Sequence, residues 1–423
     1  MQEHGKMSIT WFGPVPRVTI TKPELVREVL SNKFGHFEKL KFGRLQRMLH
    51  NGVGNHEGEK WARHRRIINP AFHLEKLKRM LPAFAACCTE LVQRWEGLAL
   101  VAGDAPCEVD VWPDMQNLTG DVISRAAFGS SYLEGRRVFQ LQGEQLELFL
   151  LAMTKMHIPG YLLLPTKVNR RMKQIAAEIE RVLKGIVAKR ENAMRAGEAT
   201  SDDLLGVLLE SNMAHCRDSK GAGMGITTDD VIGECKLFYF ADAETTSVLL
   251  TWTMILLCMH PEWQDRAREE VLRVLGPTGT PDHDGLSRLK VVTMVLYEVL
   301  RLYTPVMAIH RETYKPMELG GGGGPAGGAR AAAALRPPRQ GGVGRRRRQV
   351  QAGEVLRGDL QGIRRRTGVL PLWVGPAGYP CMPAMAPYLV YLAEAGGQGP
   401  FHDGVYTAGA YGQGGFLPPW MVV

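Results

Sequence analysis

The chain has 423 residues and a net charge of +9, and 45% of its residues are hydrophobic. This length and composition predict a globular protein with a sizeable core, in one large domain or in two to three smaller ones. The seven cysteines are irregularly spaced, and neither CxxC nor HExxH occurs, which disfavours a disulfide framework and a structural zinc site. No apolar run reaches the roughly 18 residues that a membrane span requires. The start of the chain lacks the apolar core of a signal peptide.

The first 70 residues predict a small sheet followed by two helices. Residues 9–11 and 15–20 alternate in polarity around a Gly-Pro pair, which is typical of a hairpin. A capping box at Thr21 opens a short helix that extends to about residue 30. Residues 31–55 are expected to form loops. A strongly basic helix then begins at Gly58 and ends before Pro70.

Hydrophobic periodicity predicts a succession of helices after Pro70. These helices are expected over residues 74–98, 114–128, 133–157, 167–197, 202–209, 228–260, 261–275 and 286–302. A polar loop over residues 211–225 precedes the long helix 228–260, and an extended segment over 306–313 follows the last helix. The body is therefore predicted to be mainly α with a small β-sheet.

The character of the chain changes at Gly320. Residues 320–423 contain half of the 48 glycines, runs of arginine, and +7 of the net charge, so residues 1–319 carry only about +2. Hydrophobic periodicity disappears, which is typical of low-complexity, disordered sequence. We therefore divide the chain into a patterned domain, 1–319, and a Gly/Arg/Pro-rich tail, 320–423.

The middle of the long helix is the first candidate for chemistry. Asp242 and Glu244 lie in an otherwise apolar run, and buried acids require partners. Ala241 and Thr245 share a face, where a small residue opens a groove and a threonine hydroxyl can bond back to a carbonyl. The alternative is a buried helix whose Glu244 pairs with an arginine.

Three further patterns carry charged groups at regular spacing. Glu298 and Arg301 can form an ion pair within one helix turn, although an ordinary surface pair fits the same spacing. Trp61 and Arg65 are four residues apart and can present two donors to a carboxylate or phosphate. A solvated basic face would explain them equally well. Arg311 in the extended segment could add a second anion contact.

Together, the order and separation of these four motifs resemble the cytochrome P450 family. The local sequence is most similar to the plant secologanin-synthase-like clan over residues 18–39, 52–58 and 311–316, and the resemblance extends over roughly residues 5–319. It implies a cytochrome P450 fold and a haem b cofactor. It also assigns roles to the motif residues: haem binding to Trp61, Arg65, Ala241 and Arg311, proton relay to Thr245 with Glu244, and a structural ion pair to Glu298 and Arg301.

The activity that this resemblance implies is haem-thiolate monooxygenation of a small apolar metabolite, terpenoid- or hormone-like. Electrons would come from NADPH-cytochrome P450 reductase at the cytoplasmic face of the endoplasmic reticulum membrane. A monomer and no specific nucleic-acid partner are expected. No membrane anchor is evident before Gln2, so a soluble location is the alternative.

The chain departs from the family pattern at the iron ligand, a cysteine thiolate. Cys381 is the one cysteine after Arg311, and the four motif positions around it are replaced by Val374, Ala377, Tyr379 and Pro383. We therefore assign no metal ligand and expect an incomplete fold. Asp242 also stands where the family has glycine.

These departures predict little or no activity for this chain. A frameshift or a mis-joined gene would produce the abrupt change at Gly320. Two alternatives from other classes are a non-catalytic protein whose Arg/Gly tail binds nucleic acid and an apo helical ligand-binding remnant.

Overall fold

A computed structural model describes most of the chain up to Thr313 and three short strands after it. The described residues are 7–12, 15–20, 22–31, 35, 37–103, 108–129, 132–155, 158–198, 203–217, 225–276, 281–306, 308–313, 318–319, 322–323 and 330–333. Cys381 and the tail beyond residue 333 lie outside them, so the predictions for those residues are not addressed by the structure.

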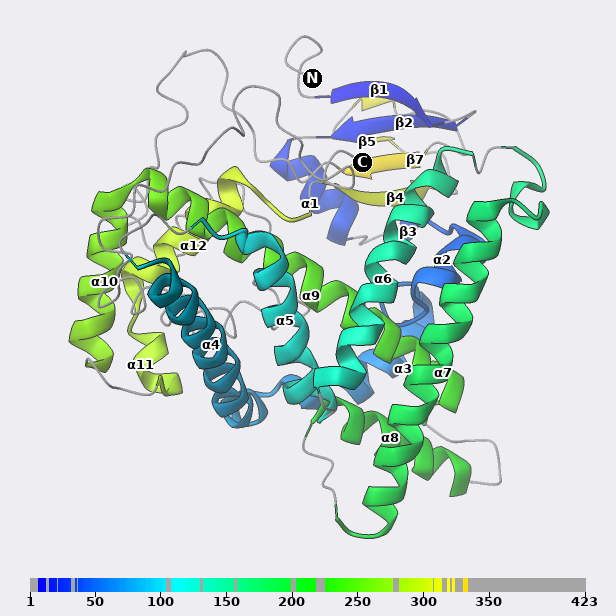
Figure 1. Ribbon diagram of the computed structural model, residues 1–423. Coiled ribbons are helices and arrows are strands. Elements are labelled where there is room, and N and C mark those ends of the chain that lie inside the picture. Colours follow the sequence, from blue (N-terminus) through cyan, green and yellow to red (C-terminus); the bar gives the residue numbers. More distant parts are fainter. Residues whose placement is uncertain are drawn as a thin grey trace.

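The described part is mainly α-helical with a small sheet at one end, as predicted (Figure 1). The helices are α1 (Pro23–Ser31), α2 (Gly43–Leu49), α3 (Gly58–Ile68), α4 (Leu74–Ala102), α5 (Val111–Phe128), α6 (Tyr132–Met153), α7 (Lys167–Arg195), α8 (Leu204–Arg217), α9 (Thr228–Met259), α10 (Pro261–Leu275), α11 (His283–Ser287) and α12 (Lys290–Leu302). Short 3-10 helices cover Asn69–Phe72 and Tyr161–Leu163.

Helix α9 runs through the middle of the helical body (Figure 1). It begins with a capping box, in which Thr227 accepts from the Asp230 amide and the Asp230 carboxylate accepts from the Thr227 amide. Its first half packs with α7 and α8 in one apolar cluster, and its second half packs with α4, α5, α10 and α12 in another. Because neighbours cover it on several sides, α9 is apolar all round its axis and not along one stripe.

The larger sheet contains strands from both ends of the described chain. Its order is β1 (Met7–Phe12), β2 (Val15–Ile20), β7 (Arg330–Ala333), β4 (Ile309–Thr313) and β3 (Phe37–Lys39). β7 is parallel to β2 and antiparallel to β4, and β5 (Glu318–Leu319) pairs with β6 (Gly322–Gly323). We expected no regular structure after Gly320. Strand pairing uses backbone groups, so a segment without a hydrophobic pattern can still complete a sheet.

Helix α2 is an element that the sequence analysis missed, since loops were expected over residues 31–55. The helix has seven residues, and its apolar side consists of Leu45 and Leu49, which are both buried. Two apolar residues one turn apart are too short a stripe for periodicity to identify a helix.

Several helix boundaries also differ from the prediction, among them the end of α8 and the start of α12. α8 continues to Arg217, where a loop was expected from residue 211, and Asn212 donates from its side-chain amide to the Ile226 carbonyl 2.8 Å away. The last helix begins at Lys290 and not at residue 286, because the short helix α11 precedes it. Both differences depend on contacts between segments that are distant in sequence.

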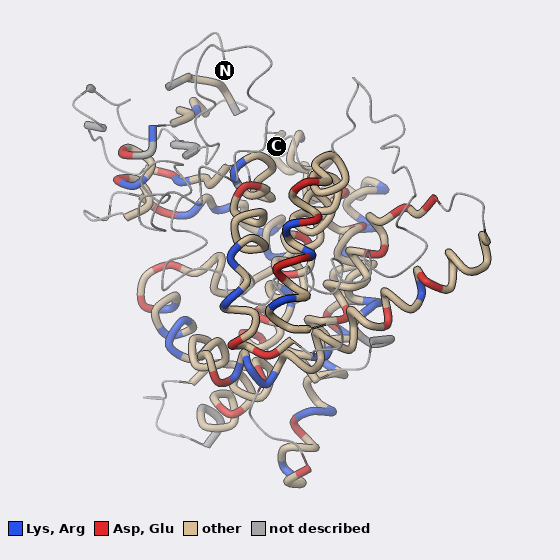
Figure 2. Tube along the Cα trace, turned by 90° about the vertical axis from the view of Figure 1, so that its left-hand side faces the viewer, with Lys and Arg blue, Asp and Glu red and all other residues tan. Residues whose placement is uncertain are grey.

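Basic and acidic residues alternate along the surface helices (Figure 2). This mixture agrees with the small net charge of residues 1–319. Among the described helices, none combines the length and the apolar character needed to cross a membrane.

Candidate functional site

In the middle of α9, two side-chain hydroxyls bond to backbone carbonyls of the helix. The Thr245 hydroxyl donates to the Ala241 carbonyl at 2.9 Å, as the sequence predicted. The Thr119 hydroxyl of α5 donates to the Ala243 carbonyl in the same turn, at 3.1 Å. Side-chain hydroxyls that bond to helix carbonyls weaken the regular ladder and favour a bend. Nothing in the sequence around Thr119 predicts its contact with this turn of α9.

Glu244 faces a cavity between α5, α6 and α9. The cavity has a volume of about 50 Å³ and is partly open to solvent, and its lining includes Gln116, Phe139, Gln142 and Phe240. Burial raises the pKa of Glu244 to about 7, and a hydrogen bond with Gln116 opposes the rise. Within the described part of the chain, its Oε2 atom has no hydrogen-bond partner. The alternative of a Glu244–arginine pair does not occur among the described ion pairs.

Asp242 is buried, with 8% of its surface exposed, and it has at least one interaction partner. A buried carboxylate at this position agrees with the expectation that its charge must be compensated. Around the axis of α9 it is offset by about 100° from Ala241 and by about 60° from Thr245.

A group of cations forms where the sheet meets α3. β3 and β4 place Lys39 opposite Arg311, and the Lys39 ammonium lies 5.9 Å from the centre of the Trp61 ring. Burial lowers the pKa of Lys39; the nearby Glu57 opposes this, and the charges of Arg311 and Arg65 lower the pKa further. Burial likewise lowers the pKa of Arg311. We call Lys39, Trp61, Arg65 and Arg311 the cationic cluster.

The cationic cluster is held by backbone contacts from the loop before α3. The Lys39 ammonium donates to the carbonyls of Val53 at 3.2 Å and His56 at 2.8 Å. Its own amide donates to the Glu57 carboxylate at 2.7 Å. Lys39 was not identified as a site residue from the sequence, because nothing local to residues 37–39 links them to α3.

This geometry bears on the two sequence interpretations of Trp61 and Arg65, an anion site and a solvated basic face. Trp61 is 39% exposed and Arg65 is half-buried, and both lie near two other cationic side chains. A solvated basic face would spread its charges apart. Cations that are crowded together while partly buried provide a receptor for anionic groups such as carboxylates.

Glu298 and Arg301 form a bidentate ion pair at 2.8 and 2.6 Å. Glu298 is only 2% exposed, so the alternative of an ordinary surface pair does not apply to it. Both residues also take part in other interactions. The pair lies on α12, whose apolar residues belong to the cluster that contains the second half of α9.

The cationic cluster is chemically suited to bind carboxylates, such as the two propionates of haem. The described cysteines are poorly suited to act as a thiolate ligand. Of the cysteines whose surroundings are described, Cys87, Cys88 and Cys235 are buried and Cys258 is half-buried. Burial raises the pKa of all four thiols, so none of them is a thiolate near neutral pH.

The sequence matches the family Cytochrome P450 over residues 1–327. Cytochrome P450 CYP72A616 of Paris polyphylla is 63% identical over 321 residues, which cover 76% of this chain and 61% of that protein. Cytochrome P450 72A15 of Arabidopsis thaliana is 55% identical over 317 residues, or 75% of this chain and 60% of that protein. The chain thus matches about three fifths of the length of these relatives.

The fold is similar to that of solved structures. The crystal structure of the cytochrome P450DA heme domain superposes with a TM-score of 0.71 at 20% identity, over 92% of this chain and 82% of that one. At this identity the likeness shows the fold alone. With the family match and the CYP72A relatives, it establishes that the chain belongs to the cytochrome P450 family, whose cofactor is haem, and to its plant CYP72 clade.

Proposed function

We propose that this chain derives from a haem-thiolate monooxygenase that hydroxylates a small apolar metabolite, terpenoid- or hormone-like. Dioxygen would be the oxidant, and NADPH-cytochrome P450 reductase would supply the electrons. The observation that carries the proposal is the cationic cluster, which joins β3, α3 and β4 at the position that the family motifs assign to the haem propionates.

The haem, when bound, supplies the redox chemistry of oxygen insertion. Trp61, Arg65 and Arg311 would hold its carboxylates, with Lys39 as a fourth donor. Ala241 leaves room on the face of α9 that also carries Thr245. The Thr245 hydroxyl, already a donor to the Ala241 carbonyl, is placed to pass a proton along this face.

Glu244 is suited to supply that proton. A carboxyl group whose pKa lies near 7 is partly protonated at neutral pH and can both give and accept a proton. Its Oε2 atom, which has no hydrogen-bond partner among the described residues, borders the cavity, where a water could exchange a proton with it.

We also propose that this chain, as it stands, supports little or no monooxygenation. The sequence around Cys381 lacks the residues of the thiolate loop. The family match ends at residue 327, close to the start of the proposed tail at 320, which supports a division of the chain into 1–319 and 320–423.

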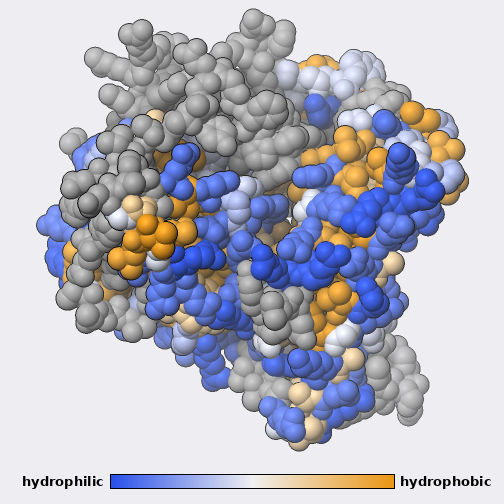
Figure 3. Space-filling view, in the orientation of Figure 1, coloured by the Kyte–Doolittle hydropathy of each residue, from blue (hydrophilic) through white to orange (hydrophobic). Residues whose placement is uncertain are grey.

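A location at the cytoplasmic face of the endoplasmic reticulum membrane is part of the proposal. Large apolar side chains are exposed around the connection between α6 and α7: Leu151, Ile158, Leu163 and Leu164. Apolar residues gather over this upper right part of the molecule (Figure 3). An exposed apolar patch of this kind favours contact with a membrane surface. We propose a monomer in this setting.

Haem retention tests the cationic cluster. We expect Arg65→Ala and Arg311→Ala each to lose haem at least about tenfold more readily, since each removes a charged hydrogen bond worth about 1.5–3 kcal/mol. Arg63→Ala, an exposed arginine on the same helix, is the control and should retain haem like the wild type. Equal retention by all variants would contradict the assignment.

A reduced, carbon-monoxide difference spectrum tests the proposed lack of activity. We expect no red-shifted Soret band, because that band requires a thiolate ligand. A clear band would show that the chain has a functional thiolate and would overturn this part of the proposal. Salt-sensitive RNA binding by the full chain would instead favour the nucleic-acid alternative.

A further inference from the structure

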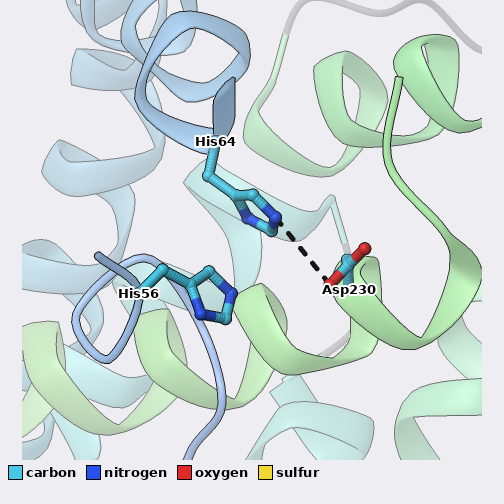
Figure 4. A group of neighbouring side chains, drawn as sticks. All are labelled: His56, His64 and Asp230. Carbon is cyan, nitrogen blue, oxygen red and sulfur yellow. Dashed lines mark ion pairs between the residues drawn. The ribbon is translucent and has the colours of Figure 1, made fainter. Parts of the chain in front are cut away.

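Two buried histidines and an aspartate meet between α3 and α9. His56 lies in the loop before α3, His64 lies on α3, and Asp230 lies in the first turn of α9 (Figure 4). One ligand atom from each residue lies within 4.8 Å of the other two. None of these residues belongs to the cationic cluster or to the Thr245 turn.

His64 is oriented by a second carboxylate. Its Nδ1 atom is 2.5 Å from Glu234 Oε1, and Glu234 is fully buried. The other oxygen of Glu234 accepts from the Val53 amide at 3.0 Å, which fixes the carboxylate in place. With the Nδ1 proton donated to Glu234, the Nε2 atom carries the lone pair. It lies 3.8 Å from the Asp230 carboxylate. A carboxylate behind a histidine is the usual support of a metal-binding imidazole.

The buried ring of His56 is a second, independent observation that points to a bound ligand. The residue is 8% exposed, and its Nε2 atom has no hydrogen-bond partner among the described residues. Its ring lies 4.5 Å from the His64 ring, with the planes at 72°. The ring points toward the space between His64 and Asp230 (Figure 4). Buried polar atoms are nearly always satisfied, so this nitrogen calls for a partner.

Some charged groups around this space would compete with a bound cation, and others would attract it. The Lys60 ammonium lies 2.7 Å from Asp230 Oδ1, but Lys60 is half exposed and can move into solvent. Lys39 also contributes positive charge at His56. Asp230 and Glu234 oppose these cations from α9.

We propose that His56, His64 and Asp230 bind one divalent transition-metal ion, for which zinc is the best match. Two imidazole nitrogens and one carboxylate oxygen are a ligand set that zinc accepts, with water in the fourth position. Ligand atoms on one tetrahedral zinc lie about 3.3 Å apart, so the observed separations must close by at most ~1.5 Å, which side-chain rotation can supply.

The ion would join three segments that are far apart in the sequence. It would link the loop before α3 and α3 itself, which carry part of the cationic cluster, to the N-terminal turn of α9, which carries Thr245 farther along. Because the folded chain alone brings the three ligands together, binding would stabilise the folded state. The open water position makes the ion exchangeable.

Zinc binding by the full-length chain tests this inference. Equilibrium dialysis against zinc chloride, followed by elemental analysis, gives the stoichiometry, and X-ray absorption at the zinc edge gives the ligand types even when haem is present. We expect one zinc per chain with two imidazole ligands. Absence of stoichiometric zinc, or a spectrum without imidazole, would overturn the proposal.

Four variants locate the site. We expect His56→Ala and Asp230→Asn to weaken zinc binding at least about tenfold. Lys60→Ala should strengthen it, because the competing ammonium is removed. His73→Ala, an exposed histidine, should bind like the wild type. Zinc binding that is unchanged in His56→Ala would refute the assignment. If that variant fails to fold, the wild-type absorption spectrum and the Lys60→Ala result still decide the question.

Discussion

The start of α12 depends on a single carboxylate from α10, and its removal is the most direct test of how this fold is held together. Glu270 is 4% exposed and accepts from three consecutive amides, those of Lys290, Val291 and Val292, at 2.9, 2.7 and 3.2 Å. These amides are unpaired within their own helix. The carboxylate also lies at the positive end of the α12 dipole. We predict that Glu270→Ala destabilises the fold strongly.

The magnitude follows from the number of donors that lose their acceptor. A buried donor left unsatisfied costs about 1–3 kcal/mol. Water can enter the space left by the side chain and satisfy some of the three, so we expect a total of about 3–5 kcal/mol. Glu270→Gln keeps one carbonyl oxygen as an acceptor and should cost about half as much.

Urea unfolding followed by far-UV circular dichroism measures this effect. With a slope of about 3 kcal/mol per molar urea or less, Glu270→Ala should lower the midpoint by at least about 1 M. The matched control is Glu269→Ala, because Glu269 is the exposed neighbour on the same helix. If the two alanine variants unfold within about 0.5 kcal/mol of each other, the carboxylate does not hold α12 and the reasoning is wrong.

Three further predictions concern α9 and its neighbours. Gly233→Ala should lower the melting temperature, costing about 1–3 kcal/mol, because the new methyl group would collide with the Asn51 carbonyl oxygen. Gly185→Ala, in an open part of α7, should raise the melting temperature, because it should stabilise the fold by about 0.5–1 kcal/mol. If the two variants shifted the melting temperature in the same direction, this reasoning would be contradicted. Glu244 has a folded-state pKa of about 7, above its unfolded value of 4.5, so stability should fall as the pH rises through this window, by about 3 kcal/mol in total. Unfolding midpoints of wild type and Glu244→Gln across this range should diverge, and parallel curves would exclude the pKa shift. Glu298→Gln should cost about 1.5–3 kcal/mol in chemical denaturation, because its partly buried arginine partner loses a counter-charge; a loss below about 1 kcal/mol would show that the pair is not important.

The long helix shows which structural features the local sequence pattern can predict. Residues 228–260 were predicted as one helix with acids in its first turn, and α9 spans Thr228–Met259 with Asp229 and Asp230 there. The bond from the Thr245 hydroxyl to the Ala241 carbonyl was also foreseen, since both atoms lie on one turn. Such features depend on residues that are close in sequence, where helical geometry dictates which groups can meet.

The boundary between α11 and α12 shows where local pattern fails. Apolar residues continue through 286–302, so periodicity alone predicts one helix. α12 nevertheless begins at Lys290, where Glu270 accepts from its first amides. The residue that decides this boundary is 20 positions earlier, and no local signal points to it.

The sequence by itself determined the family and the mainly helical architecture, and its motifs predict roles for Trp61, Arg65, Thr245 and Arg311. Motif spacing and hydrophobic periodicity are properties of the linear sequence, so they can be recognised without any tertiary contacts. The tertiary structure alone decided that Lys39 joins Arg311 beside Trp61, and that His56 and His64 meet an aspartate about 170 residues away. These groups are brought together by strand pairing and by packing against α9, which depend on the whole fold and leave no periodic trace in any one segment.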